Sequence, residues 1–295
     1  MSTVPPGGRS PGERPLGVFD SGLGGLTVVH ALRESVPEES IVYLGDTARV
    51  PYGTRSASTV IRYARSCSRV LTARGVKALV IACNTVSAVA VDILKAELDI
   101  PVIGVVEPGA RAAVEAAQTE ADRVGGPPPK IGVLGTSGTI SSGAYNRQVA
   151  QISTRFEVVG QAAPLLVPLV EEGWLEGDVP ELAVRRYVSL LLEAGAGVVV
   201  LGCTHYPLLR PVVEKVLRDL AGHDVPVVDS ALATGNVVCE MLAQGRIPRA
   251  VPNNVETAST LSLLVTDQPK GFQDSADLFL GQHTPEVEQI DLPSE

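Results

Sequence analysis

Short runs rich in Val, Ile and Leu recur along the chain, and most are separated by segments long enough to form a helix. Continuous apolar runs of roughly 4–8 residues are typical of strands that are covered on both faces, and helix-length spacing between them predicts parallel βαβ units. We therefore expect an α/β protein with mostly parallel sheets. The expected strands are 16–20, 41–45, 77–82, 101–106, 130–135, 156–160, 197–202, 225–229 and 261–265.

The order of these runs is repeated within the chain. "LGVFDSGLGG" resembles "IGVLGTSGTI", and "IVYLG" is echoed by "FEVVG". "ALVIACNTVSA" is echoed by "GVVVLGCTHYPLL", and "IPVIGVVEPGARAAVEA" by "VPVVDSALATGNVVCEM". Four echoes in the same order indicate a duplication that produces two similar lobes related by a pseudo-twofold axis. Ligands of parallel sheets bind beyond the carboxyl ends of the strands, so we expect one active site in the cleft between the lobes.

Composition limits the class of protein. The chain has 295 residues, 45% of them hydrophobic, and a net charge of −9, which argues against binding of nucleic acid because phosphates are neutralised by clustered Lys and Arg. Neither a leader-like amino terminus nor an apolar run long enough to span a membrane is present in the sequence. The four cysteines lack short paired spacing, so we expect reduced thiols and a cytoplasmic protein.

The ends of the chain and one internal stretch have the composition of tails or loops. Residues 1–14 are rich in Pro, Gly, Ser and Arg, which predicts a disordered tail. We expect a carboxyl-terminal helix at 268–281, an acidic tail at 282–295, and a linker at 119–129.

Cys83 and Cys203 occupy equivalent places in the two repeats, each at a strand end just before a predicted helix. The amides and positive dipole end of a helix favour an anion, so we expect these thiols to be partly ionised near neutral pH. Two matched cysteines are poorly explained as core residues. Cys67 and Cys239, which lie within helical patterns, are expected to serve only in packing.

Other candidate groups surround the same edges. Asp20 follows the first strand, and His205 lies two residues after the second cysteine, where an imidazole can polarise a thiol. The loop 45–56 offers backbone N–H groups and the Tyr52 hydroxyl, and Glu171 is one of two adjacent glutamates after an apolar run. The hydroxyls expected near the cleft belong to Ser21, Thr85, Thr136, Thr139 and Thr204.

A dinucleotide fingerprint fits this pattern poorly. Gly22 and Gly24 have the spacing of its first two glycines, but Thr27 stands where the third is required. Asp20 would also bring a negative charge to the pyrophosphate.

Two other functions remain open from the residues alone. Cys83, Cys203 and His205 form a possible Cys₂His zinc set with an open position, and a two-lobed binding protein for a small anionic amino acid would have the same architecture. Acid/base groups on opposite sides of one ligand instead favour stereochemical inversion, in which one group removes a proton and the other returns one to the opposite face. A Schiff-base cofactor site is disfavoured because none of the lysines has a suitable position: Lys77, Lys95, Lys130, Lys215 and Lys270.

Six motifs together resemble the glutamate racemases of the aspartate/glutamate racemase superfamily. They are "GVFDSGLGGLTV", "YLGDTARVPYG", "ACNTVSA", "GVLGTSGT", "VPLVEEG" and "LGCTHYPLL", and the resemblance extends from about residue 16 to 281. It implies an enzyme without cofactor or metal that interconverts L- and D-glutamate, supplies D-glutamate for peptidoglycan and forms a homodimer. It also implies discontinuous lobes, the first made of 15–103 and 212–267 and the second of 104–211.

The resemblance also implies roles for individual residues. Cys83 takes the α-proton of D-glutamate with help from Asp20, and Cys203 takes that of L-glutamate with help from Glu171 and His205. The implied substrate contacts are Asp20, Ser21, Tyr52, Gly53, Asn84, Thr85, Thr204 and His205.

Overall fold

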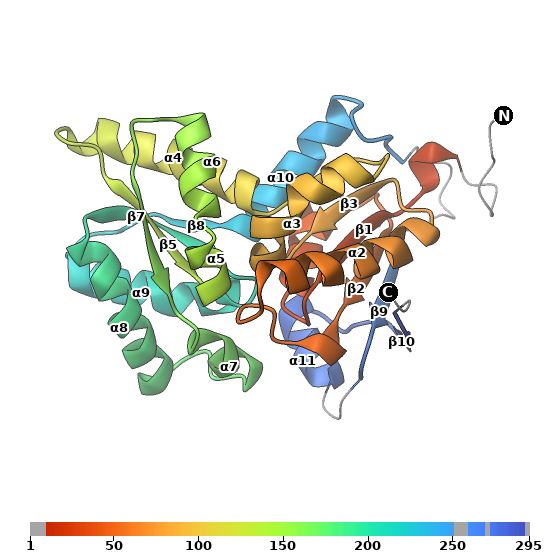
Figure 1. Ribbon diagram of the computed structural model, residues 1–295. Coiled ribbons are helices and arrows are strands. Elements are labelled where there is room, and N and C mark those ends of the chain that lie inside the picture. The colour runs from red at the N-terminus through yellow and green to blue at the C-terminus, as the bar shows by residue number, and fades with distance from the viewer. Residues whose placement is uncertain (1–9, 251–258, 269–271, 293–295) are drawn as a thin grey trace.

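The computed structural model describes residues 10–250, 259–268 and 272–292 and contains two parallel sheets. The larger sheet has six strands in the order β10-β9-β2-β1-β3-β4 (Figure 1). We call this sheet and its helices the first lobe. Its strands are β1 (Leu16–Asp20), β2 (Ile41–Gly45), β3 (Ala78–Ile81), β4 (Val102–Gly104), β9 (Leu261–Val265) and β10 (Val287–Gln289).

The smaller sheet has four strands in the order β6-β5-β7-β8, and we call this sheet and its helices the second lobe. This order repeats the order β2-β1-β3-β4 of the first lobe, so the predicted α/β fold with two duplicated parallel sheets is confirmed. Its strands are β5 (Lys130–Gly135), β6 (Val158–Ala162), β7 (Ala196–Gly202) and β8 (Val227–Asp229).

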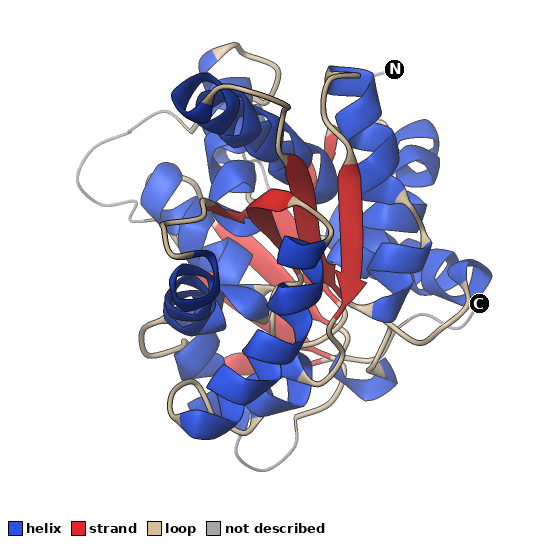
Figure 2. Ribbon diagram, turned by 90° about the vertical axis from the view of Figure 1, so that its left-hand side faces the viewer, coloured by secondary structure: helices blue, strands red, loops and turns tan. Residues whose placement is uncertain are grey.

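Helices flank the strands of both sheets (Figure 2). The helix that follows the last repeated strand crosses to the other lobe in both halves: α4 packs on α6 and β7, and α10 packs on α1. These two crossings join the lobes. The helices are α1 (Leu26–Ser35), α2 (Ala57–Ala73), α3 (Asn84–Glu97), α4 (Val106–Val124), α5 (Ser137–Ser141), α6 (Ala144–Ile152), α7 (Leu166–Glu171), α8 (Asp178–Glu193), α9 (Arg210–Ala221), α10 (Ser230–Ala243) and α11 (Phe272–Leu280), with 3-10 turns η1 (Pro11–Glu13), η2 (Thr47–Arg49) and η3 (Tyr206–Leu209).

The central strands read as continuous apolar runs because both of their faces are buried. Along β1, Leu16 and Val18 pack in one core cluster while Phe19 packs in the cluster on the other face. Along β7, Val199 belongs to one cluster and Val200 to another. Alternating side chains therefore reach two different cores, and neither face requires polar residues.

The lobe boundary predicted at residue 212 is wrong for the segment 212–229. Helix α9 packs on α8, and β8 pairs with β7, so this segment extends the second lobe. The internal sequence repeat had matched β8 with β4. In agreement with that match, β8 occupies the same position in the second sheet that β4 occupies in the first. The chain returns to the first lobe only with α10.

Two further segments differ from expectation. The predicted linker 119–129 begins inside α4, which ends only where Gly125 adopts a φ of 69°. The predicted acidic tail contains β10, which pairs with β9 at the sheet edge. Within the predicted amino-terminal tail, residues 11–13 form a 3-10 turn and residues 1–9 lie outside the described part of the chain.

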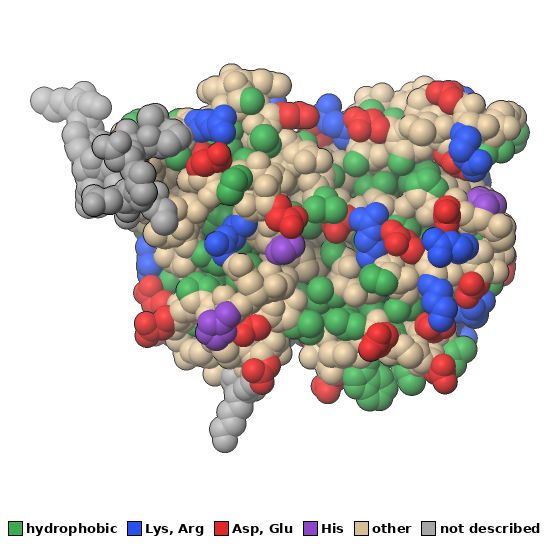
Figure 3. Space-filling model, turned by 180° about the vertical axis from the view of Figure 1, so that it is seen from behind, with side chains coloured by type: hydrophobic (Ala, Val, Ile, Leu, Met, Phe, Trp, Pro, Cys, Tyr) green, Lys and Arg blue, Asp and Glu red, His purple; other side chains and the backbone are tan. Residues whose placement is uncertain are grey.

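The surface carries charges of both signs. On the face seen in Figure 3, Lys and Arg side chains are interspersed with Asp and Glu rather than gathered into one basic patch. In the described part of the chain, no helix is both long and apolar enough to cross a membrane.

Candidate active site

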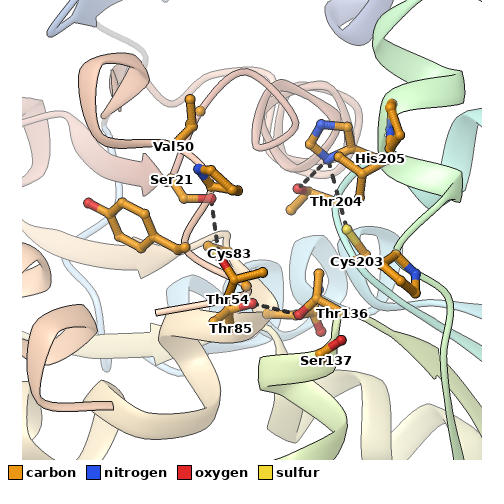
Figure 4. Close-up of a pocket in the computed structure, with 18 of the residues that line it drawn as sticks. Ser21, Val50, Thr54, Cys83, Thr85, Thr136, Ser137, Cys203, Thr204 and His205 are labelled. Carbon is orange, nitrogen blue, oxygen red and sulfur yellow. Dashed lines mark hydrogen bonds between the residues drawn. The ribbon is translucent and has the colours of Figure 1, made fainter. Parts of the chain in front are cut away.

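A cavity of about 330 Å³ lies between the lobes, beyond the carboxyl ends of β1, β3, β5 and β7 (Figure 4). Residues from both repeats contribute to its wall, as expected for two parallel sheets that face each other. The lining residues are Ser21, Gly22, Val50, Pro51, Tyr52, Gly53, Thr54, Cys83, Asn84, Thr85, Thr136, Ser137, Pro164, Val167, Pro168, Glu171, Cys203, Thr204 and His205.

The two matched cysteines both line this cavity and are nearly buried, each with 6% of its surface exposed. Cys83 is the N-cap residue of α3, and its Sγ lies 3.4 Å from Ser21 Oγ. Cys203 directly follows β7, and its Sγ lies 3.9 Å from His205 Nδ1. Figure 4 shows each thiol beside its own polar neighbour. The structure therefore brings together the pair that the repeat predicted.

The electrostatic environment of Cys83 differs from the sequence expectation. Burial, followed by the negative charge of nearby Asp20, raises the pKa of the Cys83 thiol to about 12, although the Ser21 hydroxyl and the Val86 amide act in the opposite direction. The helix N-terminus is too weak to offset desolvation here. Burial beside Asp20 therefore favours the protonated thiol of Cys83, in contrast to the partial ionisation expected from the helix N-terminus alone.

Asp20 lies behind the cavity wall rather than in it. Its side chain is buried, and Oδ2 accepts a hydrogen bond from the Gly22 amide at 3.0 Å. Oδ1 has no hydrogen-bond partner in the described part of the chain. Burial raises the pKa of Asp20, and the charge of His205 opposes this shift. The carboxylate therefore keeps one oxygen available near the first thiol.

The second thiol has a cationic neighbour. His205 Nε2 lies 3.2 Å from Glu171 Oε1, and the imidazole packs edge-on against Phe279 at 5.0 Å between ring centroids. Burial disfavours the cation, but Cys203 and Glu171 together outweigh it and raise the pKa of His205 to about 10. Glu172, the other glutamate of the pair, does not line the cavity. The two thiols thus differ in electrostatic surroundings, one beside an anion and one beside a cation.

This shift predicts a pH-dependent stability. Since the pKa of His205 is near 6.5 when unfolded and about 10 when folded, the imidazolium stabilises the fold fully below about pH 6.5, and this stabilisation is lost as the pH rises through 10. We expect this imidazolium to contribute on the order of 3 kcal/mol to the free energy of unfolding, a value already reduced to allow for the exposure of Glu171. Tm measured from pH 6 to 10 should fall more steeply for the wild type than for His205→Gln, and parallel curves would contradict this assignment.

Hydroxyls and an amide complete the polar wall. Thr85 Oγ1 of the first lobe lies 2.9 Å from Thr136 Oγ1 and 3.3 Å from Thr139 Oγ1 of the second lobe. These hydrogen bonds join the two lobes across the cavity floor. Thr139 is buried beneath the wall and does not line the cavity. Asn84 Oδ1 accepts from the Tyr145 hydroxyl at 2.8 Å, which holds the amide in one orientation.

The Tyr52 hydroxyl, expected to face the ligand, does not do so. It donates to the buried carboxylate of Asp46, away from the cavity. The amides of Tyr52, Gly53 and Thr54 find no acceptor within the described part of the chain, although all three residues line the cavity. The loop therefore offers its backbone rather than its phenol.

Comparison with known proteins agrees with this geometry. Residues 26–237 match the family described as Asp/Glu/Hydantoin racemase. The chain belongs to this family. It is 45% identical over 280 residues to the glutamate racemase of Geobacter metallireducens, covering 95% of this chain and 97% of that protein.

Solved structures give the same result. The glutamate racemase of Francisella tularensis in complex with D-glutamate matches with a TM-score of 0.81 and 33% identity, covering 95% of this chain and 98% of that chain. The glutamate racemase isoform of Bacillus anthracis matches with a TM-score of 0.83 and 33% identity, covering 96% and 100%.

The alternative functions find less support in the geometry. Gly24 is needed for close packing, since a Cβ there would lie 2.3 Å from Thr204 Oγ1 and 2.6 Å from His205 Nδ1. The glycine turn thus makes room for the opposite lobe rather than for a pyrophosphate. Within the described residues, no three His, Cys, Asp or Glu side chains gather closely enough to hold a metal ion.

Several residues of the cavity wall were not predicted from the sequence. Pro164, Val167 and Pro168 form an apolar section, and Thr54 and Ser137 add hydroxyls. Val167 and Pro168 lie in the short helix α7, and Pro164 precedes it. A run of Leu, Val and Pro in the sequence indicates only that these residues are buried. Nothing in their pattern distinguishes a cavity wall from a core.

Proposed function

We infer that this protein is a glutamate racemase that interconverts L- and D-glutamate without pyridoxal phosphate. The observation that carries this conclusion is the pair of thiols, Cys83 and Cys203, that come from equivalent strand ends and line one small cavity. The family membership and the glutamate racemases at 45% and 42% identity support it. By this activity the protein supplies D-glutamate for peptidoglycan.

We propose that the two thiols act from opposite faces of the α-carbon. A thiolate at Cys83 takes the α-proton of D-glutamate, the bond electrons remain on the α-carbon, and the thiol of Cys203 returns its proton to the other face to give L-glutamate. The reverse reaction exchanges these roles. Asp20, whose charge acts on the Cys83 thiol, assists that thiol. Glu171 assists Cys203 through His205, which contacts both groups.

We propose that the remaining polar groups hold the two carboxylates and the ammonium group of glutamate. Ser21, Asn84, Thr85, Thr136 and Thr204 line the cavity, and the amides of the loop at Tyr52 and Gly53 are free to donate. Thr139 supports the floor through its bonds to the other threonines. Donors held in place around a carboxylate stabilise the negative charge that develops when the α-proton leaves.

Among the residues that the structure describes, no lysine lines this cavity. Lys77 is buried in an ion pair with Glu39 at the opposite edge of the first sheet. The carbanion must therefore be stabilised by hydrogen bonds and by exclusion of water.

We further propose a cytoplasmic homodimer. The family resemblance supports the dimer, and so do the exposed apolar side chains Leu165, Trp174 and Leu182 on and beside α7 and α8. Light scattering on the purified protein measures its mass directly, and a monomer at micromolar concentration would refute the dimer.

The activity is tested in deuterated water. Each pure enantiomer should be converted to the racemic mixture, and the α-position of the product should carry deuterium because the donating thiol exchanges with solvent. The rate is followed by circular dichroism and the label by mass spectrometry. Retention of the α-hydrogen in the product, or no conversion at all, would refute a proton-transfer racemase.

A further inference from the structure

The loop Val50–Thr54 forms one wall of the cavity, and its only buried side chain is Tyr52. The remaining residues of the loop are intermediate or exposed, and Val50 has 46% of its surface exposed. Tyr52 is therefore the residue of this loop whose side chain anchors the wall in the protein interior.

The Tyr52 hydroxyl donates to a buried carboxylate. Asp46 has no exposed surface, and its Oδ2 accepts from the Tyr52 hydroxyl and from Arg49 Nε at 2.6 Å. Its Oδ1 accepts from Thr266 Oγ1 at 2.9 Å, at the end of β9. The backbone N–H of Asp46 donates to the carbonyl of Asp20 at 3.1 Å. One residue thus connects the loop to two strand ends.

The cation that shares this carboxylate is also enclosed. The Arg49 guanidinium stacks over the ring of Tyr63 at 4.0 Å, and the rings of Tyr63 and Tyr52 are 5.2 Å apart. Arg49 Nη2 lies 3.8 Å from Cys67 Sγ on α2. Loss of one partner from such a buried pair is costly because it leaves the other charge without compensation. The cluster is therefore a firm attachment for the loop.

The other end of the loop is attached across the cleft. The carbonyl of Gly53 accepts from the Gly138 amide of the second lobe at 2.9 Å, and a Cβ on Gly138 would lie 2.9 Å from that oxygen. Between the two attachments, the amides of Tyr52, Gly53 and Thr54 have no acceptor in the described part of the chain. Amides held without a protein partner beside a cavity are prepared to bind an anion.

We propose that Asp46 is a positioning residue for substrate binding, which acts through the Tyr52 hydroxyl to hold the loop amides where they meet a substrate carboxylate. This inference rests on the proposed racemase activity. Asp46 does not line the cavity and touches no reacting atom. Its loss should weaken binding of both enantiomers and leave proton transfer between the thiols nearly unchanged.

The test compares Asp46→Asn and Tyr52→Phe with the wild type in both directions. The two enantiomers have equal free energies in water, so kcat/KM must change by the same factor in each direction. We expect KM for L- and D-glutamate to rise about tenfold in each variant, with kcat changed less than threefold. The double variant should resemble the stronger single variant because both substitutions act on the same hydrogen bond.

Tyr63→Phe is the matched control. It removes a neighbouring phenol that makes no hydrogen bond in the described chain and preserves the ring contacts, so KM should stay within twofold of the wild type. Hydrogen exchange provides a readout independent of activity: amides 52–54 should exchange faster in Asp46→Asn and Tyr52→Phe.

The outcomes separate this inference from the function on which it rests. If the wild type does not racemise glutamate, the proposed function fails. If the wild type is active and KM and loop exchange are unchanged in folded Tyr52→Phe protein, the positioning role is refuted, even where Asp46→Asn does not fold. A fall in kcat at constant KM would also refute it, since that result assigns Asp46 to the chemical step.

Discussion

Cys83→Ser and Cys203→Ser should each lower the rate of glutamate racemisation by roughly 10³-fold or more. A hydroxyl is a much weaker acid than a thiol, so serine cannot supply the base on its own face of the substrate. Burial and the charge of Asp20 raise the pKa of the Cys83 thiol to about 12, and the same surroundings would disfavour an alkoxide at this position even more strongly. A substrate ammonium group offsets the charge of Asp20 and so favours the thiolate.

The two variants should differ in which enantiomer still exchanges its α-hydrogen. Cys83→Ser retains the thiol that attacks L-glutamate, so L-glutamate should take up deuterium slowly without inversion. Cys203→Ser should do the same with D-glutamate. Mass spectrometry of each enantiomer separated on a chiral column measures both effects.

Cys239→Ser is the matched control, since this cysteine is exposed on α10 and does not line the cavity. It should racemise at the wild-type rate. If the variants at the two cavity cysteines also racemise within a few-fold of wild type, then the two-thiol mechanism is incorrect.

Lys77→Met should lower the free energy of unfolding by about 3–5 kcal/mol. The ion pair of Lys77 with Glu39 is almost completely buried, with 2% of each side chain exposed. Lys77 Nζ also donates to the carbonyl of Gly12 at 2.8 Å, and Glu39 Oε1 accepts from the Ala250 amide at 2.9 Å. Removal of the cation leaves a buried carboxylate without its charge partner, which is the costly case for such pairs.

Thermal or urea unfolding of three variants tests this expectation. Lys77→Met together with Glu39→Met should be less destabilising than Lys77→Met alone, because the double variant leaves no buried charge. Arg65→Met breaks an exposed ion pair with Glu97 and should leave Tm nearly unchanged. Equal stability of the wild type and Lys77→Met would show that the buried pair does not stabilise the fold.

Much of the fold was predictable because a strand buried on both faces appears in the sequence as a continuous apolar run. Leu16–Asp20 and Leu261–Val265 match the predicted runs residue for residue, since both faces of these strands meet apolar cores. Strand β10, Val287–Gln289, was missed because it lies at a sheet edge and is partly exposed, so its polar residues resemble a tail. Edge strands need no apolar run.

The candidate site was predictable to the extent that it is repeated. Cys83 and Cys203 were found because duplication places equivalent residues at equivalent strand ends, and the parallel topology brings those ends to one edge. Val167 and Pro168 were not found, because an apolar wall has the same composition as a core. The direction of the Tyr52 hydroxyl was predicted wrongly for a similar reason, since its partner Asp46 is chosen by packing.

The sequence by itself determined which residues stand at the strand ends and that they come in two matched sets. That information is local, because the apolar runs and the residues that follow them are contiguous in the chain. Only the tertiary structure decided the electrostatic character of each thiol. Burial raises the pKa of Cys83 beside Asp20, while Cys203 lies beside a cationic His205. Desolvation and charge depend on groups that are distant in sequence, so the electrostatic surroundings of a thiol cannot be predicted from the residues next to it.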